Sequence, residues 1–212
     1  MTHYPIYLNL VNRLCLVIGG GKVAERKIQT LLEYGARVTV VSPELQPSIR
    51  QWFEEGKISY IQEPFRPDML EGVLLVFIAT NQPDVNHYIT ETCRSRGVLV
   101  NTVDDPPNCD FYVPALVKRQ SLSLAISTEG KSPLFAARLR RKLEQLIPPE
   151  YGEFVEIMGD LRQQVKALEP DIHKRRQFYE EIMDSDILDL LLEGKRDQVE
   201  ERIEECISCL QE

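Results

Sequence analysis

The sequence predicts an α/β fold: a doubly wound parallel sheet, then a β-hairpin with a helix, and finally a small all-α region. Three observations support this. Short apolar runs alternate with helical patterns as far as about residue 110, two strand-like runs then follow each other directly, and acidic helical sequence fills the last third of the chain. We therefore predict three parts, residues 1–112, 113–147 and 148–212.

The first predicted element is a buried strand, Leu14–Ile18, whose apolar run ends at three glycines. A helix should follow over residues 23–34, because its apolar side chains recur at core-facing spacing and Gly35 is placed to end it. The same alternation predicts further strands at residues 38–41, 58–61, 74–78 and 98–100, with helical stretches at residues 49–53, 68–70 and 85–96.

The second half begins with two strand-like runs, residues 111–117 and 122–126, whose short connection predicts a hairpin. A helix should open at Ser132, a capping residue that is followed by proline at the first helical position, and end near Leu146. Two prolines then interrupt the chain. Four further helices are predicted at residues 154–167, 176–183, 186–192 and 199–210.

Charge and composition exclude several functions. The formal net charge of −8 argues against a general nucleic-acid binder. Residues 113–146 nevertheless hold seven Lys and Arg against two Asp and Glu, which suits a small polyanionic ligand. No apolar run approaches the roughly 20 residues of a membrane span, and the first residues do not resemble a secretion signal. We expect a cytoplasmic protein without a membrane or nucleic-acid partner.

The five cysteines are irregularly spaced and odd in number, so we interpret them as reduced thiols. Cys206 and Cys209 have the C-x-x-C spacing of a redox pair or of half a zinc site. They lack a second cysteine pair and a nearby histidine. We therefore favour the interpretation that they are two small residues on one face of a helix. The three histidines are scattered, and we predict no metal site.

Residues 19–24, GGGKVA, carry the clearest motif. They have the form G-x-G-x-x-A, directly after a buried strand and at the start of a helix. Gly19 permits the tight turn, and Gly21 lets the backbone approach a pyrophosphate. The free N–H groups at Lys22 and Val23 add the positive end of the helix dipole. A glycine-rich loop without a ligand is the alternative. The position of the motif favours a Rossmann-type dinucleotide site.

The end of the second strand indicates which dinucleotide binds. Many NAD sites place an acidic residue there to bind the adenosine ribose. Ser42 stands at the strand end, Pro43 follows, and Glu44 is the nearest carboxylate. No arginine lies beside them to accept the 2′-phosphate of NADP. We therefore expect NAD as the cofactor.

Polar residues also follow the fourth and fifth strands, at the sheet edge where cofactor and substrate meet. They are Thr80, Asn81, Asn101, Val103 and Asp104. The two asparagines could equally be ordinary turn formers. The Asp104 carboxylate would stand near a nicotinamide, where it can take a proton as a hydride leaves. A plain turn is the alternative for Asp104, and Asp105 is the fallback acid.

Five separated motifs together resemble the precorrin-2 dehydrogenase family, which makes sirohydrochlorin on the route to siroheme. They are residues 4–8, 19–27, 79–81, 101–105 and 127–133. The resemblance covers residues 4–148 and implies NAD-dependent oxidation of the tetrapyrrole precorrin-2. Some members also insert ferrous iron into the product. The resemblance further implies a homodimer, built by the segment after the sheet, and a small helical domain that closes the site.

The resemblance also assigns residues. Lys22, Val23, Pro43 and Glu44 would line the dinucleotide, and Asp104 matches the key acidic residue of the family. At Thr128 some relatives carry a serine that can be phosphorylated, so this regulation is in doubt here. The substrate would carry eight carboxylates, which gives the basic segment a purpose. The candidate substrate-binding residues are Asn101, Thr128, Lys131, Ser132 and Arg138.

Two alternatives accompany this hypothesis. One is a bifunctional enzyme that also acts as a ferrochelatase through the same cleft, and the sequence does not decide between the two. The other belongs to a different class, a non-catalytic NAD sensor with a dimerising helical tail. A sensor explains the glycine loop but not the motifs at residues 103–105 and 128–133.

Overall fold

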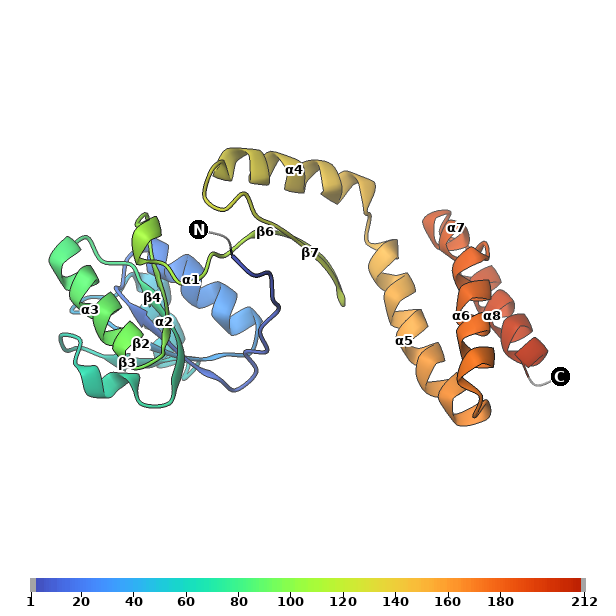
Figure 1. Cartoon of the computed structure of the whole chain (residues 1–212), viewed down its shortest axis with the longest axis horizontal. Coiled ribbons are helices and arrows are strands. Elements are labelled where there is room, and N and C mark those ends of the chain that lie inside the picture. Colours follow the sequence, from blue (N-terminus) through green and yellow to red (C-terminus); the bar gives the residue numbers. More distant parts are fainter. Residues whose placement is uncertain (1–2, 211–212) are drawn as a thin grey trace. The chain divides into compact units, whose positions relative to one another are not determined.

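The computed structural model describes residues 3–210, with the side chains of residues 209 and 210 outside the description. The chain divides into two compact units, Met1–Val113 and Pro114–Glu212. Figure 1 shows the order of their helices and strands along the chain.

The first unit contains a five-stranded parallel sheet in the order β3-β2-β1-β4-β5. Its strands are β1 (Leu14–Ile18), β2 (Arg37–Val41), β3 (Ser59–Ile61), β4 (Val73–Ile78) and β5 (Leu99–Thr102). Its helices are α1 (Lys22–Glu33), α2 (Pro47–Glu54), α3 (Pro83–Ser95) and the short 3-10 helices η1 (Pro67–Leu70) and η2 (Pro106–Asn108). Chain order reverses beside β1, so the carboxyl ends of β1 and β4 form the switch point at which such sheets bind ligands.

Two apolar clusters cover the two faces of this sheet. Alternate residues of β1 supply both, because successive side chains of a strand point to opposite faces. Cys15 and Val17 pack with Ile28 of α1, and all three are fully buried. Leu16 and Ile18 pack on the other face with the cluster that includes Ile89 of α3. A strand that is apolar throughout is therefore the expected signature of a central strand covered on both sides.

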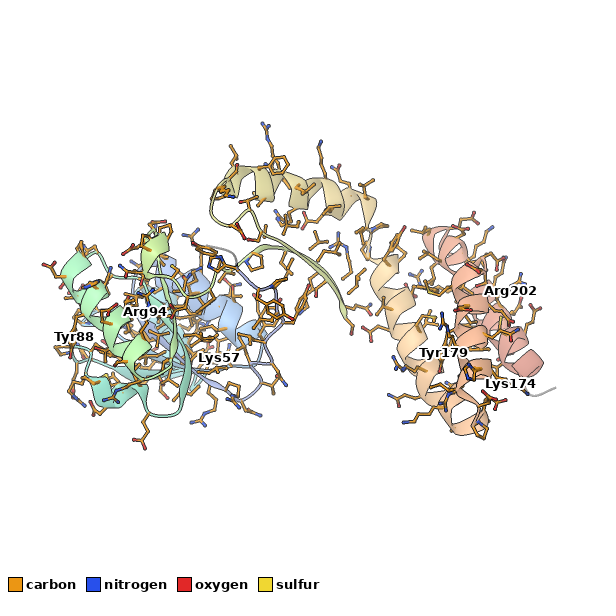
Figure 2. The ribbon with its side chains drawn as sticks, in the orientation of Figure 1. Lys57, Tyr88, Arg94, Lys174, Tyr179 and Arg202 are labelled. Carbon is orange, nitrogen blue, oxygen red and sulfur yellow. The ribbon has the colours of Figure 1, made fainter. Side chains whose placement is uncertain are left out.

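The second unit begins with an antiparallel hairpin, β6 (Ala115–Arg119) and β7 (Leu122–Ile126). Its helices are α4 (Pro133–Leu146), α5 (Glu150–Leu168), α6 (Ile172–Asp184), α7 (Ile187–Leu192) and α8 (Arg196–Leu210). Residues of α5 to α8 share one apolar core, with Val165, Ile182 and Ile187 fully buried. In Figure 2, Tyr179 lies within this group of helices, and its hydroxyl donates a hydrogen bond to the Arg162 carbonyl at 3.4 Å.

The predicted fold class is confirmed, and the first strand has the predicted bounds. Two strands differ. β5 runs to Thr102 because its polar end is satisfied inside the protein, where the Thr90 and Thr102 hydroxyls share a 3.1 Å hydrogen bond. β6 begins at Ala115 and not at residue 111, because the Phe111 ring packs edge-on against Phe77 of the first unit, 5.4 Å between centroids.

The described cysteines agree with reduced thiols. Cys15, Cys93, Cys109 and Cys206 are free, and the side chain of Cys209 lies outside the described part of the chain. The C-x-x-C interpretation therefore stays untested. Among the described side chains, no group of acidic, cysteine and histidine residues could hold a metal ion. No helix of the described chain is long and apolar enough to cross a membrane.

Candidate dinucleotide-binding site

The turn between β1 and α1 depends on glycines for two different reasons. Gly19 has a φ of +121°, and a Cβ there would lie 2.4 Å from the Ala79 carbonyl oxygen. A Cβ on Gly20 would lie 1.9 Å from the Glu44 carbonyl oxygen. At Gly21 a Cβ would meet nothing within 4 Å. The first two glycines therefore let strand ends approach each other, whereas Gly21 faces open space that a ligand can enter.

The start of α1 leaves backbone donors available. Its first intrahelical hydrogen bond runs from the Glu25 N–H to the Gly21 carbonyl at 3.0 Å, and no described side chain caps the helix. The N–H groups of Lys22 and Val23 precede that bond. Uncapped first-turn donors at the positive end of a helix dipole form a binding site for a phosphate. The residues present thus fit the diphosphate of a dinucleotide.

A cleft of about 690 Å³ opens beside this turn, at the carboxyl ends of β1 to β4. Seven predicted cofactor residues line it: Gly19, Gly21, Ser42, Pro43, Glu44, Thr80 and Asn81. The side chain of Lys22 is exposed and that of Val23 half-buried, and neither lines the cleft. Their predicted contribution is through their N–H groups, so this placement is compatible with it.

The loop after β2 is held by its own hydrogen bonds. Ser42 is buried, and its hydroxyl donates to the Glu44 carbonyl at 2.7 Å. The Gln46 N–H donates to the Gly20 carbonyl at 2.8 Å, which ties this loop to the glycine turn. The Ser42 hydroxyl thus shapes the turn, and the Glu44 carboxylate is the exposed group at the cleft. The predicted ribose contact of Glu44 is compatible with this position and stays a prediction.

Thr80 likewise stabilises the loop after β4 through hydrogen bonds. Its hydroxyl donates to the Asn86 side-chain oxygen, and the Asn86 amide donates back to the Thr80 carbonyl at 3.2 Å. Asn86 is buried at the start of α3, so this pair fixes the loop that carries Asn81. Asn81 itself is exposed and lines the cleft.

The end of β5 continues the same edge of the sheet. The Val103 N–H donates to the Ile78 carbonyl at 3.0 Å, which joins β5 to the end of β4. Asp104 follows with a φ of +58° and an exposed side chain. An aspartate in this left-handed conformation is uncommon. Neither Val103 nor Asp104 lines the cleft described above, which covers the ends of the other four strands.

Two residues anchor the loop that follows Asp104. Asn101 is buried, and its amide donates to the Phe111 carbonyl at 2.9 Å. Arg94 of α3, labelled in Figure 2, donates to the Asp110 carboxylate and to the Pro107 carbonyl, each at 3.1 Å. The Asn101 side chain thus has a structural partner, and its predicted substrate contact stays a prediction.

The other predicted substrate residues belong to the second unit. The Ser132 N–H donates to the Thr128 hydroxyl at 3.1 Å, and the Ser132 hydroxyl accepts from the Phe135 N–H at 3.4 Å. Ser132 therefore caps α4 as predicted. Lys131 is exposed and lies 3.9 Å from the Glu129 carboxylate, and Arg138 is exposed on α4. These two cations are available to a ligand.

Sequence reasoning missed part of the cleft. Some of its lining residues come from segments without a motif: residues 62–65 follow β3, and Val85 lies in the first turn of α3. The Phe65 ring also packs edge-on against the Tyr88 ring, with 6.3 Å between the ring centroids. Only the fold brings the loop after β3 and the start of α3 to the same cleft. The rule that ligands bind at the carboxyl ends of parallel strands was the available signal.

The sheet order, the glycine turn and the cleft define a dinucleotide-binding protein of the Rossmann class. Comparison with known families agrees. Residues 6–115 match the family model described as putative NAD(P)-binding, residues 119–146 match the central region of sirohaem biosynthesis protein, and residues 150–207 match the sirohaem synthase dimerisation region. The chain therefore belongs to the putative NAD(P)-binding family. The predicted family and a nicotinamide dinucleotide as cofactor are confirmed.

Individual relatives extend this result. Siroheme synthase 1 of Aeromonas hydrophila is 37% identical over 209 residues, and siroheme synthase of Thioalkalivibrio sulfidiphilus is 36% identical over 207. Each match covers 98% of this chain but only 45% and 42% of the relative, so the chain spans less than half of their length. A solved structure, SirC, precorrin-2 dehydrogenase, matches 94% of this chain and 100% of its own with 28% identity and a TM-score of 0.78.

Proposed function

We propose that this chain catalyses the NAD-dependent oxidation of precorrin-2 to sirohydrochlorin in siroheme biosynthesis. The observation that carries the proposal is the likeness to SirC, precorrin-2 dehydrogenase, which extends over both units of the chain. The glycine turn, the uncapped start of α1 and the cleft support the cofactor half of the proposal.

The charges at the cleft favour NAD over NADP. Its charged lining residues are Glu44 and Glu63, and both are acidic. Glu63 forms an ion pair with Arg66, whereas Glu44 is exposed at the loop after β2. A carboxylate can accept hydrogen bonds from the two ribose hydroxyls, and it repels a 2′-phosphate. Glu44 is thus the proposed selector of NAD.

Asp104 is the proposed proton acceptor. Oxidation of precorrin-2 removes two hydrogens, one as a hydride and one as a proton. When bound at the glycine turn, NAD⁺ would supply the hydride acceptor. The proton that leaves a carbon or nitrogen of the tetrapyrrole passes to the Asp104 carboxylate, which then releases it to solvent. The exposed position of Asp104 at the end of β5 and the anchored loop behind it support this role.

The substrate side of the proposal uses the exposed cations of the second unit. Lys131 and Arg138 would bind substrate carboxylates, and Thr128 and Ser132 shape the turn that carries Lys131. Arg140 instead pairs with Glu144, and Arg119 donates to the carbonyls of Glu144 and Ile147. The basic segment is therefore partly structural and partly available for a polyanion.

We also propose a homodimer. A two-stranded hairpin is marginal by itself, and both outer edges of the β6-β7 sheet lack a further strand in the described chain. α4 beside it exposes Leu134, Phe135 and Leu146. A second copy of this hairpin region would satisfy the edges and cover the apolar side chains. Light scattering during gel filtration tests this. A monomer at micromolar concentration would contradict it.

A cytoplasmic location stays part of the proposal, and cell fractionation tests it.

The decisive experiment supplies purified protein with precorrin-2 and NAD and records NADH and sirohydrochlorin absorbance together. We expect equal amounts of both, no reaction with heat-denatured protein and a large loss in Asp104→Asn. NADH binding without tetrapyrrole binding or turnover would favour the sensor hypothesis instead.

Iron insertion is a second candidate function, because the relatives are named siroheme synthases. It predicts Fe²⁺-dependent consumption of sirohydrochlorin above the spontaneous rate.

A further inference from the structure

The end of β3 lies against the loop that follows β2. The two strands pair in parallel, with Val41 opposite Ile61. One more backbone bond runs from the Ser42 N–H to the Ile61 carbonyl at 3.2 Å. Pro43 has no N–H, so the ladder of backbone bonds cannot continue through it. The carbonyl groups at this point therefore depend on side-chain donors or on water.

Two side chains at the end of β3 supply such donors. The Tyr60 hydroxyl lies 2.9 Å from the Ser42 carbonyl oxygen and 3.3 Å from that of Pro43. Its single proton can serve only one of the two oxygens at a time. The Gln62 amide donates to the Pro43 carbonyl at 3.0 Å. Side chains of β3 and of the residue after it thus hold the start of the loop.

The Tyr60 ring is itself held in place. It is half-buried and packs against the apolar cluster on one face of the sheet. The Phe53 ring of α2 meets it edge-on, with 5.6 Å between the ring centroids. Gln62 lines the cleft, whereas Tyr60 does not. Tyr60 therefore acts on a bound dinucleotide through the loop, whereas Gln62 is also placed to touch it.

The same loop carries Glu44, the proposed selector of NAD. The Glu44 carbonyl accepts a hydrogen bond from the Ser42 hydroxyl at 2.7 Å, so the carbonyl groups of residues 42, 43 and 44 each have a side-chain donor. The Glu44 carboxylate is exposed, and it has no hydrogen bond or ion pair within the described chain. Its position at the cleft therefore depends on the backbone of the loop.

We propose that Tyr60 is a positioning residue for Glu44 and thereby determines the preference of this site for NAD over NADP. The inference rests on the proposed function, in which Glu44 binds the ribose hydroxyls. A carboxylate must be held in place to distinguish a ribose hydroxyl from a phosphate, because hydrogen bonds weaken steeply as their geometry departs from the ideal. The Tyr60 hydroxyl holds the loop at the two residues directly before Glu44.

Calorimetry with NAD and with NADP tests the proposal without any tetrapyrrole. Tyr60→Phe removes one hydroxyl and keeps the ring. We expect NAD binding to weaken about two- to tenfold, the range for one lost hydrogen bond, and NADP binding to change less. A general loss of structure would weaken both dinucleotides alike and leave the ratio of their Kd values unchanged. An unchanged ratio in folded Tyr60→Phe protein would overturn the proposal.

Tyr179→Phe is the matched control. Tyr179, labelled in Figure 2, also donates its hydroxyl to a backbone carbonyl, but within the helices of the second unit. We expect this variant to keep the wild-type ratio of Kd values. A change in the control as large as that of Tyr60→Phe would overturn the proposal, because the effect would then not belong to the loop after β2.

A double-mutant cycle with Glu44 tests whether Tyr60 acts through this carboxylate. Glu44→Gln protein lacks the selecting charge, so adding Tyr60→Phe should leave its ratio of Kd values unchanged. A further change as large as that of the single Tyr60→Phe variant would overturn the proposal, because Tyr60 would then act independently of Glu44.

The outcomes for cofactor choice and for the reaction are separate. If the ratio of Kd values changes as expected but the protein makes no NADH from precorrin-2, the inference on Tyr60 stands and the proposed function fails. If precorrin-2 is oxidised but the wild-type protein binds NAD and NADP equally, the proposed reaction stands and the inference on Tyr60 fails.

Discussion

Gly21→Asp should change cofactor affinity and stability in opposite directions. Gly21 is the N-cap of α1 with φ −89° and ψ −175°, a backbone conformation that any residue adopts, and a Cβ there meets no protein atom within 4 Å. Aspartate is a favoured N-cap and its charge complements the helix dipole, so stability should rise by a few tenths to about 1 kcal/mol. The fold should tolerate the change.

Affinity should fall because the new carboxylate occupies the place of a phosphate. Two like charges about 4 Å apart repel by about 4 kcal/mol at the effective dielectric constant of a protein surface, and salt reduces this. A net loss of about 2–4 kcal/mol corresponds to NAD binding weakened roughly 30- to 1000-fold. Isothermal titration calorimetry with NAD gives the Kd, and urea unfolding of the apo protein gives the stability.

Gly20→Ala is the matched comparison. Its methyl would lie 1.9 Å from a backbone oxygen, so the turn must shift and stability should fall by about 1–3 kcal/mol. Wild-type NAD affinity in Gly21→Asp would refute the assignment of the phosphate site. A large loss of stability in the same variant would refute the claim that Gly21 faces open space.

Three further predictions concern other parts of the chain. Burial raises the pKa of Cys15 and of Cys93 from 9.0 to about 11. The folded state thus binds these protons more tightly than the unfolded state, so stability should be intact below pH 9 and fall between pH 9 and 11, by up to about 2 kcal/mol per thiol, in urea unfolding. The double Cys→Ala variant should lose most of this slope. Glu44→Gln should weaken NAD binding about tenfold and NADP binding less, as measured by calorimetry; equal losses would argue against Glu44 as selector. Arg119→Met should destabilise the second unit by about 2 kcal/mol, since carbonyls at the end of α4, including that of Ile147, lose their donor. An unchanged urea midpoint would contradict this last expectation.

Local sequence pattern was sufficient to predict the central strand of the first unit. The run Leu14–Ile18 is apolar throughout and stops at glycine, so both the strand and its place in the middle of the sheet could be predicted. The ends of β5 and β6 could not. Thr102 looks like a loop residue until the Thr90 hydroxyl is known to face it, and Phe111 looks like a strand residue until its packing on Phe77 is known. Both depend on contacts between distant segments.

The candidate site, too, could be predicted from the sequence only in part. Gly19, Gly21 and Glu44 follow from a motif and from its distance to the next strand end. Phe65 does not, because its position depends on how the loop after β3 returns to the cleft. The sequence did not single out Lys27, although this residue ends the motif at residues 19–27. A lysine on a helix is ordinarily a solvated residue, and only the structure shows that it lies over Phe77.

The uncapped start of α1 has a thermodynamic consequence for the protein without ligand. No described side chain accepts a hydrogen bond from the first N–H groups of α1, so these donors can bind an anion. Dinucleotide binding should therefore raise the melting temperature in proportion to the logarithm of ligand concentration. A melting curve with NAD, with NADP and with neither would rank the two dinucleotides even before any tetrapyrrole is at hand.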